Sequence, residues 1–333
     1  RAGGGKMTHD PNFTGGRTED MVADAEEARR VRAPSRMERV GDHLKREWQL
    51  YVMLIPTILW LLLFLYKPMY GLQIAFMDYS IFRGVAGSPW VGWEHFQTLF
   101  TNDQFLRAVR NTIYISALNL LFGFPAPIIL ALMFNEVMHA TYKRTAQTIV
   151  YLPHFISSVI IAGIVITAFS PSAGIVNTFI GWLGFDPVYF LTQPEWFRPI
   201  FVGTGIWQEA GFGSIVFLAA IAGVNPSLYE SAVVDGANRW QMMWKITIPS
   251  ILPTILIMLI IRIGNVMEVS FELVILLYQP STYETADVVN TYIYRNGLQG
   301  GQYDLAAAAG FFNAVMAFIL VMTANTISKR YSR

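Results

Sequence analysis

The sequence has no cysteine among its 333 residues, which excludes disulfide bridges, thiolate metal sites and cysteine nucleophiles. Without cysteines the redox compartment stays undetermined. Charged residues are also scarce, at 14% of the chain against about 25% in an ordinary soluble domain. The net charge is +1 and the body of the chain has no basic stripe, so we expect no binding to nucleic acid.

Signatures of catalysis and of nucleotide binding are missing as well. Most histidines lie in tails and loops without a second ligand at metal spacing, and we expect His154 to be packed or interfacial. Gly5-Lys6-Met7 lacks the hydroxyl residue of a phosphate loop and follows no strand-like run. We therefore expect a chain that is not an enzyme and that holds no metal or cofactor of its own.

What the sequence does contain is long apolar runs, since hydrophobic residues make up 53% of it. A helix needs about 20 apolar residues to cross a hydrocarbon core of about 30 Å. The pattern predicts an all-α membrane protein with six transmembrane helices, over about 49–67, 109–135, 147–170, 200–222, 249–278 and 304–327.

The ends of the chain are polar, and the basic residues indicate the orientation. Residues 1–42 are rich in glycine and mixed in charge, which predicts a disordered cytoplasmic tail before a membrane domain over 43–333. Lysine and arginine are concentrated on the cytoplasmic side of membrane proteins. The segments that flank the predicted spans on one side of the membrane contain more of these residues: Arg36, Arg39, Lys45, Arg46, Lys143, Arg144, Arg239, Lys245, Lys329, Arg330 and Arg333. The segments on the other side contain mainly Lys67, Arg83, Arg107, Arg198 and Arg295. Both termini should therefore face the cytoplasm.

The segment 225–249, between the fourth and fifth predicted spans, should form a pair of short helices on the cytoplasmic surface. Either Asn225 caps the first helix, followed by Pro226, or Ser227 and Glu230 form a capping box. Gly236 interrupts that helix, a second helical turn runs over about 237–245, and Pro249 opens the fifth span. Such a pair suits docking to a partner protein.

The same segment resembles a known motif. Glu230-Ser231-Ala232, then Gly236, then Ile246 to Pro249 is similar to the EAA loop of binding-protein-dependent ABC importer permeases, with Ser231 and Ile248 as departures. In that family the loop is a coupling helix pair in a cleft of the ATPase subunit. The resemblance therefore implies an ATPase-coupling role for this set: Glu230, Ser231, Ala232, Gly236, Ile246 and Pro249.

The resemblance extends over most of 44–328. The segments Leu44 to Tyr51, Pro68 to Phe76 and Gly87 to Phe96 are similar to the LplB-like branch of the MalF-like carbohydrate permeases. This implies a bacterial inner-membrane importer of oligosaccharides, with alginate or other polyuronate fragments as one candidate. The implied partners are nucleotide-binding ATPase subunits that hold ATP and magnesium, a second homologous permease in a heterodimer, an extracytoplasmic substrate-binding protein and membrane lipid.

The fifth predicted span carries polar groups: Arg262, Asn265, Glu268 and Glu272. On a continuous helix they fall within an arc of roughly 120 degrees. An ionisable group facing lipid costs at least ~2.5 kcal/mol, so this face should look into a cavity or a partner helix. The two interpretations are a substrate path and an internal ion pair that only stabilises packing.

Three further alternatives stay open. Trp90, Trp93, Trp182 and Trp196 either stack on sugar rings or form an interfacial aromatic belt. An ion-coupled secondary transporter could use Glu268 or Glu272, although we find no convincing internal repeat. A multi-span enzyme such as a lipid-linked glycosyltransferase would need clustered carboxylates or histidines at a membrane face, and the sequence contains no such cluster.

Overall fold

The computed structural model describes residues 46–267 and 269–331. The predicted tail over 1–42 and Glu268 lie outside the described residues. The chain divides into two compact units, Arg1–Tyr70 and Gly71–Arg333. In the first unit, the described elements are α3 (Trp48–Leu61), the π-helical turn η1 (Leu62–Tyr66) and α4 (Lys67–Met69).

The prediction of an all-helical membrane fold is confirmed. The described residues form one isolated β-bridge, between Met77 and Trp90. Within residues 46–267 and 269–331, five helices are long and apolar enough to span a membrane: Trp48–Phe76, Asp103–Glu136, Pro194–Ala222, Arg239–Gly264 and Tyr303–Thr326. A bent pair, Ala140–Phe155 and Ser158–Ala168, brings the number of spans to 6 if it is counted as one.

The bent pair corrects the straight span predicted over 147–170. Its two halves meet at an angle of 104°. The first half ends in a 3₁₀ turn that contains Pro153, and Ile156 then adopts an extended conformation. Ser157 starts α10 (Ser158–Ala168) as its N-cap, accepting a hydrogen bond from the Ile160 amide at 3.5 Å. The change of direction thus coincides with a proline and a new cap, which hydropathy alone does not register.

The fifth predicted span, 249–278, is also wrong as one helix. It divides into α15 (Ile248–Gly264) and α16 (Phe271–Leu277), joined by a segment that is not helical where it is described. The predicted run has about 30 residues, whereas about 20 are enough to cross the hydrocarbon core. The helix stops at Gly264 and Asn265, a pair that favours helix ends.

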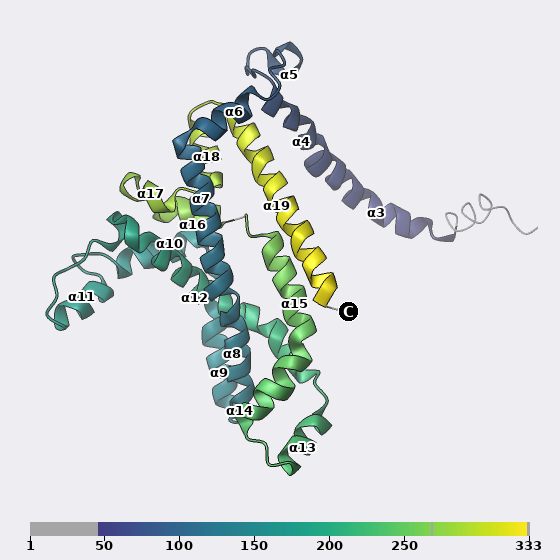
Figure 1. Ribbon diagram of the computed structural model, residues 1–333, viewed down its shortest axis with the longest axis vertical. Helices are drawn as coiled ribbons and strands as arrows, with labels where there is room; N and C mark the ends of the chain where they lie inside the picture. Colours follow the sequence, from purple (N-terminus) through teal and green to yellow (C-terminus); the bar gives the residue numbers. More distant parts are fainter. Residues whose placement is uncertain (1–45, 268, 332–333) are drawn as a thin grey trace, which may run out of the picture. The chain divides into compact units, whose positions relative to one another are not determined.

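The second unit is a helical bundle with α12 (Pro194–Ala222) at its centre (Figure 1). α12 packs along α8 (Pro125–Glu136), and α15 packs against α19 (Tyr303–Tyr331). α7 (Asp103–Leu118) continues through the π turn η3 (Asn119–Gly123) into α8. α12 also lies close to α9 (Ala140–Tyr151), where a Cβ atom at Gly211 would overlap the Val150 carbonyl.

Two pairs of short helices mark the two ends of this unit (Figure 1). α13 (Pro226–Val234) and α14 (Arg239–Met242) lie at one end, whereas α6 (Glu94–Thr101) and α18 (Val289–Ile293) lie at the other. The remaining elements are η2 (Tyr70–Phe76), α5 (Gly84–Gly87), η4 (Leu152–Phe155), α11 (Ile175–Trp182), η5 (Phe190–Thr192), η6 (Met243–Thr247), η7 (Pro280–Thr282), α17 (Tyr283–Ala286) and η8 (Tyr294–Gln299).

Candidate functional site

The segment from Asn225 to Thr247, which we call the α13–α14 segment, forms the predicted pair of short helices. Asn225 caps α13 through its side-chain oxygen, which accepts from the Ser227 amide at 3.0 Å, so the first of the two capping alternatives is correct. Gly236 ends the helix with φ at 77°, in the left-handed region that favours glycine. Asn238 and Gln241 then form a capping box for α14.

The second helix of the pair is shorter than predicted. α14 begins at Arg239 rather than near Ala237, and from Met243 the chain continues as the π turn η6 into α15. Asn238 adopts an extended conformation as the cap, so the residues just before Arg239 are excluded from the helix.

The predicted coupling residues all lie on this segment or at the start of α15. Glu230, Ser231, Gly236 and Pro249 are exposed, and Ala232 and Ile246 are half-buried. Large apolar side chains are exposed alongside them: Leu228, Val233, Val234, Trp240 and Trp244. Five exposed apolar side chains on one short segment favour contact with a partner protein or with lipid. The ATPase-coupling role of the six residues remains a prediction.

Few contacts hold this segment to the bundle. Within the segment, the Tyr229 hydroxyl of α13 lies 3.0 Å from Oγ1 of Thr247, the residue that precedes α15. An ion pair of 3.5 Å joins Arg239 to Glu136 at the end of α8. Both pairs line a cavity of about 320 Å³ between the segment and the bundle. The segment is therefore joined to α8 through the Arg239 ion pair and continues directly into α15.

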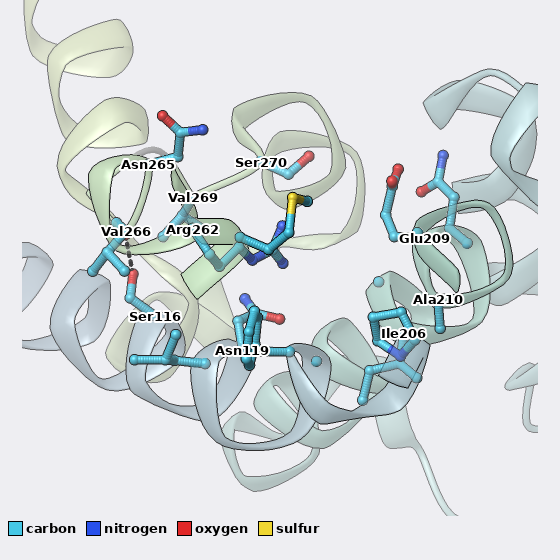
Figure 2. Close-up of a pocket in the computed structure, with 18 of the residues that line it drawn as sticks. Ser116, Asn119, Ile206, Glu209, Ala210, Arg262, Asn265, Val266, Val269 and Ser270 are labelled. Atoms are coloured by element: carbon cyan, nitrogen blue, oxygen red, sulfur yellow. Dashed lines mark hydrogen bonds between the residues drawn. The ribbon is translucent and has the colours of Figure 1, made fainter. Parts of the chain in front are cut away.

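A larger cavity, of about 420 Å³, lies between α7, η3, α8, α12 and α15 (Figure 2). We call it the polar cavity. Much of its wall is apolar, with three glycines, Gly123, Gly205 and Gly213. Its polar side chains are Ser116, Asn119, Gln208, Glu209, Arg262, Asn265 and Ser270. The Ser116 hydroxyl donates to the Val266 carbonyl, in the stretch where the fifth span is broken.

The structure separates the four polar residues predicted to share one face of the fifth span. Arg262 and Asn265 line the polar cavity, and Glu268 lies outside the described residues. Glu272 does not line the cavity: it belongs to α16 and accepts a hydrogen bond of 3.0 Å from the Ser158 hydroxyl of α10. The single-face prediction fails because it assumed one continuous helix through a point where the chain changes direction.

Other spans contribute polar residues to the cavity that were not predicted from the sequence. Glu209 on α12 pairs with His154, with Oε2 and Nδ1 3.3 Å apart, and the His154 ring stacks on Phe212 at 4.0 Å between centroids. His154 is therefore packed, as expected. The Gln208 side-chain amide donates to the Ile156 carbonyl at 3.5 Å. A polar side chain within an apolar run was the signal used for the fifth span, and it also marks Asn119, Gln208 and Glu209.

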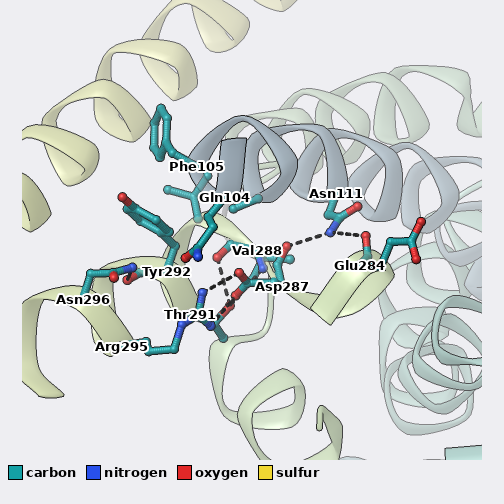
Figure 3. Close-up of polar contacts among 12 residues, drawn as sticks. Gln104, Phe105, Asn111, Glu284, Asp287, Val288, Thr291, Tyr292, Arg295 and Asn296 are labelled. Atoms are coloured by element: carbon teal, nitrogen blue, oxygen red, sulfur yellow. Dashed lines mark hydrogen bonds and ion pairs between the residues drawn. The ribbon is translucent and has the colours of Figure 1, made fainter. Parts of the chain in front are cut away.

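A second polar cluster, also missed, organises the stretch between α16 and α19 (Figure 3). The Asp287 carboxylate is fully buried, and Arg295 donates to both of its oxygens, at 2.9 and 2.6 Å. Thr291 donates to the same carboxylate at 2.8 Å. The hydrogen bond to Asp287 raises the pKa of Arg295 above its ordinary value, so the guanidinium stays charged.

Two further side chains connect this cluster to the spans. The Asn111 side chain of α7 donates to the carbonyls of Glu284 and Asp287, both at 3.0 Å. Arg198 of α12 donates to the Asn111 side-chain oxygen at 2.9 Å and to the Thr285 carbonyl at 3.3 Å. The stretch 284–295 is thereby fastened to α7 and α12 by directional bonds. We call the five side chains Asn111, Arg198, Asp287, Thr291 and Arg295 the anchor cluster.

The four tryptophans proposed for sugar stacking do not come together on one surface. Trp90 stacks on Phe76 with centroids 5.6 Å apart, and Trp93 contacts the same ring edge-on at 5.4 Å. Trp196 packs edge-on against Phe190 at 5.0 Å, whereas Trp182 is exposed on α11. The choice between sugar stacking and an aromatic belt stays a prediction.

Comparisons with known proteins agree with the geometry. A family model described as "Binding-protein-dependent transport system inner membrane component" matches residues 123–333. Protein LplB of Bacillus subtilis (strain 168) is 44% identical over 290 residues, which cover 87% of this chain and 91% of that protein. The polygalacturonan/rhamnogalacturonan transport system permease protein YteP of the same organism is 44% identical over 282 residues, covering 85% and 88%.

Two similar solved structures come from bacterial alginate importers. One chain, of an ABC transporter involved in the import of the acidic polysaccharide alginate, is 60% identical with a TM-score of 0.84 and covers 89% of this chain and 100% of that chain. The other belongs to an alginate ABC transporter in complex with an alginate pentasaccharide-bound periplasmic protein. It is 59% identical with a TM-score of 0.83, and the coverage is 89% and 99%.

Proposed function

The chain belongs to the binding-protein-dependent transport system inner membrane components, and on that premise we propose that it forms half of the translocation path of an ATP-driven oligosaccharide importer. We propose polyuronate fragments of the alginate type as substrates, because chains of alginate importers are 60% and 59% identical to it. This family consists of transport permeases rather than enzymes.

The observation that carries the proposal is the polar cavity beside a broken span. Backbone that is not helical is tolerated at membrane depth only where it is buried in protein or lines a water-filled cavity. The stretch after Gly264 meets this condition, since Asn265, Val266, Val269 and Ser270 all line the cavity. Amide and hydroxyl groups there offer donors and acceptors that match sugar hydroxyls. The homologous permease of a heterodimer would supply the other half of the path.

We propose that the ATPase subunits dock on the α13–α14 segment through Glu230, Ser231, Ala232, Gly236, Ile246 and Pro249. ATP and magnesium belong to those subunits, and this chain holds no cofactor. The distribution of lysine and arginine supports placing the segment and both termini in the cytoplasm. The opposite end of the second unit, with α6 and α18, then receives the substrate-binding protein.

The mechanism that follows is alternating access. Closure of the ATPase subunits moves the α13–α14 segment, which is linked to α8 through the Glu136–Arg239 ion pair and continues through η6 into α15. Both helices line the polar cavity, α8 through Pro127 and α15 through Arg262, so their displacement changes which side of the membrane the cavity opens to.

The ion-coupled carrier receives no support. Of its two candidate carboxylates, Glu272 is hydrogen-bonded to Ser158 away from the cavity, and Glu268 lies outside the described residues. The multi-span enzyme is set aside as well, because the matching family is one of transport permeases.

The proposal is tested by binding-protein-stimulated ATP hydrolysis in the reconstituted complex of this chain, its companion permease and the ATPase. Gly236→Trp is compared with Gly301→Trp, because both glycines have positive φ, 77° and 72°, and a Cβ at either meets nothing within 4 Å. The strain is matched and only the location differs. We expect Gly236→Trp to abolish recovery of the ATPase and Gly301→Trp to retain it. An ATPase that never co-purifies with the wild-type chain, or hydrolysis indifferent to Gly236→Trp, overturns the proposal.

A further inference from the structure

The polar cavity holds two charged side chains among the described residues, and they differ in how they are paired. Glu209 has a histidine beside it, with its Oε2 atom 3.3 Å from His154 Nδ1. Arg262 makes no ion pair with an acid of residues 46–267 or 269–331, and its side chain is directed into the cavity (Figure 2). Glu272, the acid that the sequence placed on the same face, is bonded elsewhere. Within the part of the chain that the structure describes, Arg262 is therefore the cation of this cavity that is open to a ligand.

The side-chain carboxamide of Asn119, which can both donate and accept hydrogen bonds, lies near the same part of the cavity wall as the Arg262 guanidinium. A Cβ atom built at Gly123 would lie 3.9 Å from Arg262 Nη2 and 3.8 Å from Asn119 Oδ1. A Cβ at Gly205 would also lie 3.9 Å from Asn119 Oδ1. The guanidinium and the carboxamide thus converge on a wall whose two glycines leave room for a ligand to approach both groups.

The chemistry of this pair identifies a ligand. A guanidinium offers a planar fork of donors that matches a carboxylate in two parallel hydrogen bonds, and a carboxamide both donates to and accepts from hydroxyls. A uronate ring carries a carboxylate close to its hydroxyls. We propose that Arg262 binds the carboxylate of an acidic sugar unit while Asn119 bonds a neighbouring hydroxyl, which makes this half of the path selective for uronate over neutral sugars. The inference rests on the proposed function.

The negative charge of Glu209 does not oppose this assignment. Its Oε2 atom lies 3.3 Å from Nδ1 of His154 in η4, and the His154 ring stacks on Phe212 at an interplanar angle of 1°. Arg262 and Asn119 lie on α15 and η3, and Figure 2 shows Glu209 on a different wall. A sugar carboxylate at Arg262 is thus separated from that acid across the cavity.

The test measures direct binding to the reconstituted complex without the binding protein, because that protein makes its own selection. The probes are trimannuronate and the same trisaccharide with its carboxyl groups reduced to alcohols. A charge-assisted pair of hydrogen bonds corresponds to about tenfold or more in affinity. We expect the wild type to bind trimannuronate more tightly than the reduced trisaccharide by about that factor. Arg262→Gln should remove this preference, because it should lower the affinity for trimannuronate and leave the affinity for the reduced trisaccharide unchanged.

Two matched variants separate the role of the fork from that of charge. Arg262→Lys retains the charge without the planar fork, so it should fall between the wild type and Arg262→Gln. Arg83→Gln, which removes an exposed cation paired with Asp78 outside the cavity, should leave both affinities unchanged.

Equal weakening of both probes by Arg262→Gln, or no effect on either, overturns the inference, as does a wild type that binds neither. Stimulated ATP hydrolysis by the wild-type complex then decides whether the proposed function falls as well. If hydrolysis still responds to the binding protein, the importer assignment stands and only the role of Arg262 is lost.

Discussion

Two ion pairs at opposite ends of the second unit show how differently the molecule is held together at those ends. Asp287 and Arg295 approach to 2.6 Å with side chains 0% and 20% exposed, whereas Glu136 and Arg239 are 3.5 Å apart with side chains 43% and 61% exposed. The first pair belongs to the anchor cluster, which fastens the α17–η8 stretch to α7 and α12. The second is one of few contacts that attach the α13–α14 segment. A buried, fully bonded cluster sets one geometry, while an exposed segment can adjust to a partner.

The largest expected effect is from Asp287→Asn. The variant keeps the size of the side chain but leaves the Arg295 charge without its partner in a mostly buried site. Breaking a buried pair costs about 3 to 5 kcal/mol, and the 20% exposure of Arg295 places this case at the lower end. We expect a large drop in the melting temperature of the solubilised complex. The double variant Asp287→Asn/Arg295→Gln should regain part of the loss, and a double variant as unstable as the single one contradicts the ion-pair explanation.

Asn111→Leu should come next. This substitution keeps the branched shape of the side chain but leaves the carbonyls of Glu284 and Asp287 without their donor and Arg198 without the side-chain oxygen that accepts from it. A buried unsatisfied polar group costs about 1 to 3 kcal/mol, so we expect a loss of about 2 to 3 kcal/mol, measured by thermal unfolding. Gln97→Leu, on the exposed face of α6, is the control and should change stability by less than about 0.5 kcal/mol.

Glu136→Gln, at the other end, should cost less than about 1 kcal/mol, because exposed pairs gain little from Coulomb attraction in water. The small difference should shrink further between low and high salt, which screens exposed charges. A loss as large as that of Asp287→Asn, measured under the same conditions, would show that the α13–α14 segment is held as rigidly as the anchor cluster.

Tyr292→Phe should have the smallest effect at neutral pH. The Tyr292 hydroxyl is buried without a hydrogen-bond partner among the described residues, and its ring keeps the contact with Phe105 in either form. Burial raises the pKa of Tyr292 above its ordinary value. The unfolded chain therefore loses this proton first, and stability falls as the pH rises from about 10 through the folded-state pKa. The phenylalanine variant should lose less stability than the wild type on alkaline titration.

The local features of the α13–α14 segment were largely predictable. A cap at Asn225, a break at Gly236 and a new span near Pro249 depend on residues within a few positions of one another, and the structure shows the first two as expected. The start of α14 was placed too early because Asn238 competes for the cap. The motif at Glu230 to Ala232 also lies within one helix, so its spacing could be recognised without any tertiary contact.

The polar cavity was predictable only in part. Arg262 and Asn265 stood out as polar residues in an apolar run, and both line the cavity. The same signal was present at Asn119 and Gln208, yet nothing in the order of residues says that η3, α12 and α15 face a common space. The break after Gly264 removed Glu272 from the set, because hydropathy continues through the break and gives no sign of it.

The sequence by itself determined that this protein is helical and lies in a lipid bilayer. Its apolar runs are long enough to cross a membrane, and its caps and glycines shape the short helices. Those properties are local, since each depends on hydrogen bonds and side chains within one helix or turn. Only the tertiary structure decided where spans bend and which polar groups meet. Asn111 reaches the carbonyl of Asp287, 176 positions away, and such a contact exists only after helices have packed. Packing is decided by the whole set of apolar surfaces at once, which no single segment of the sequence contains.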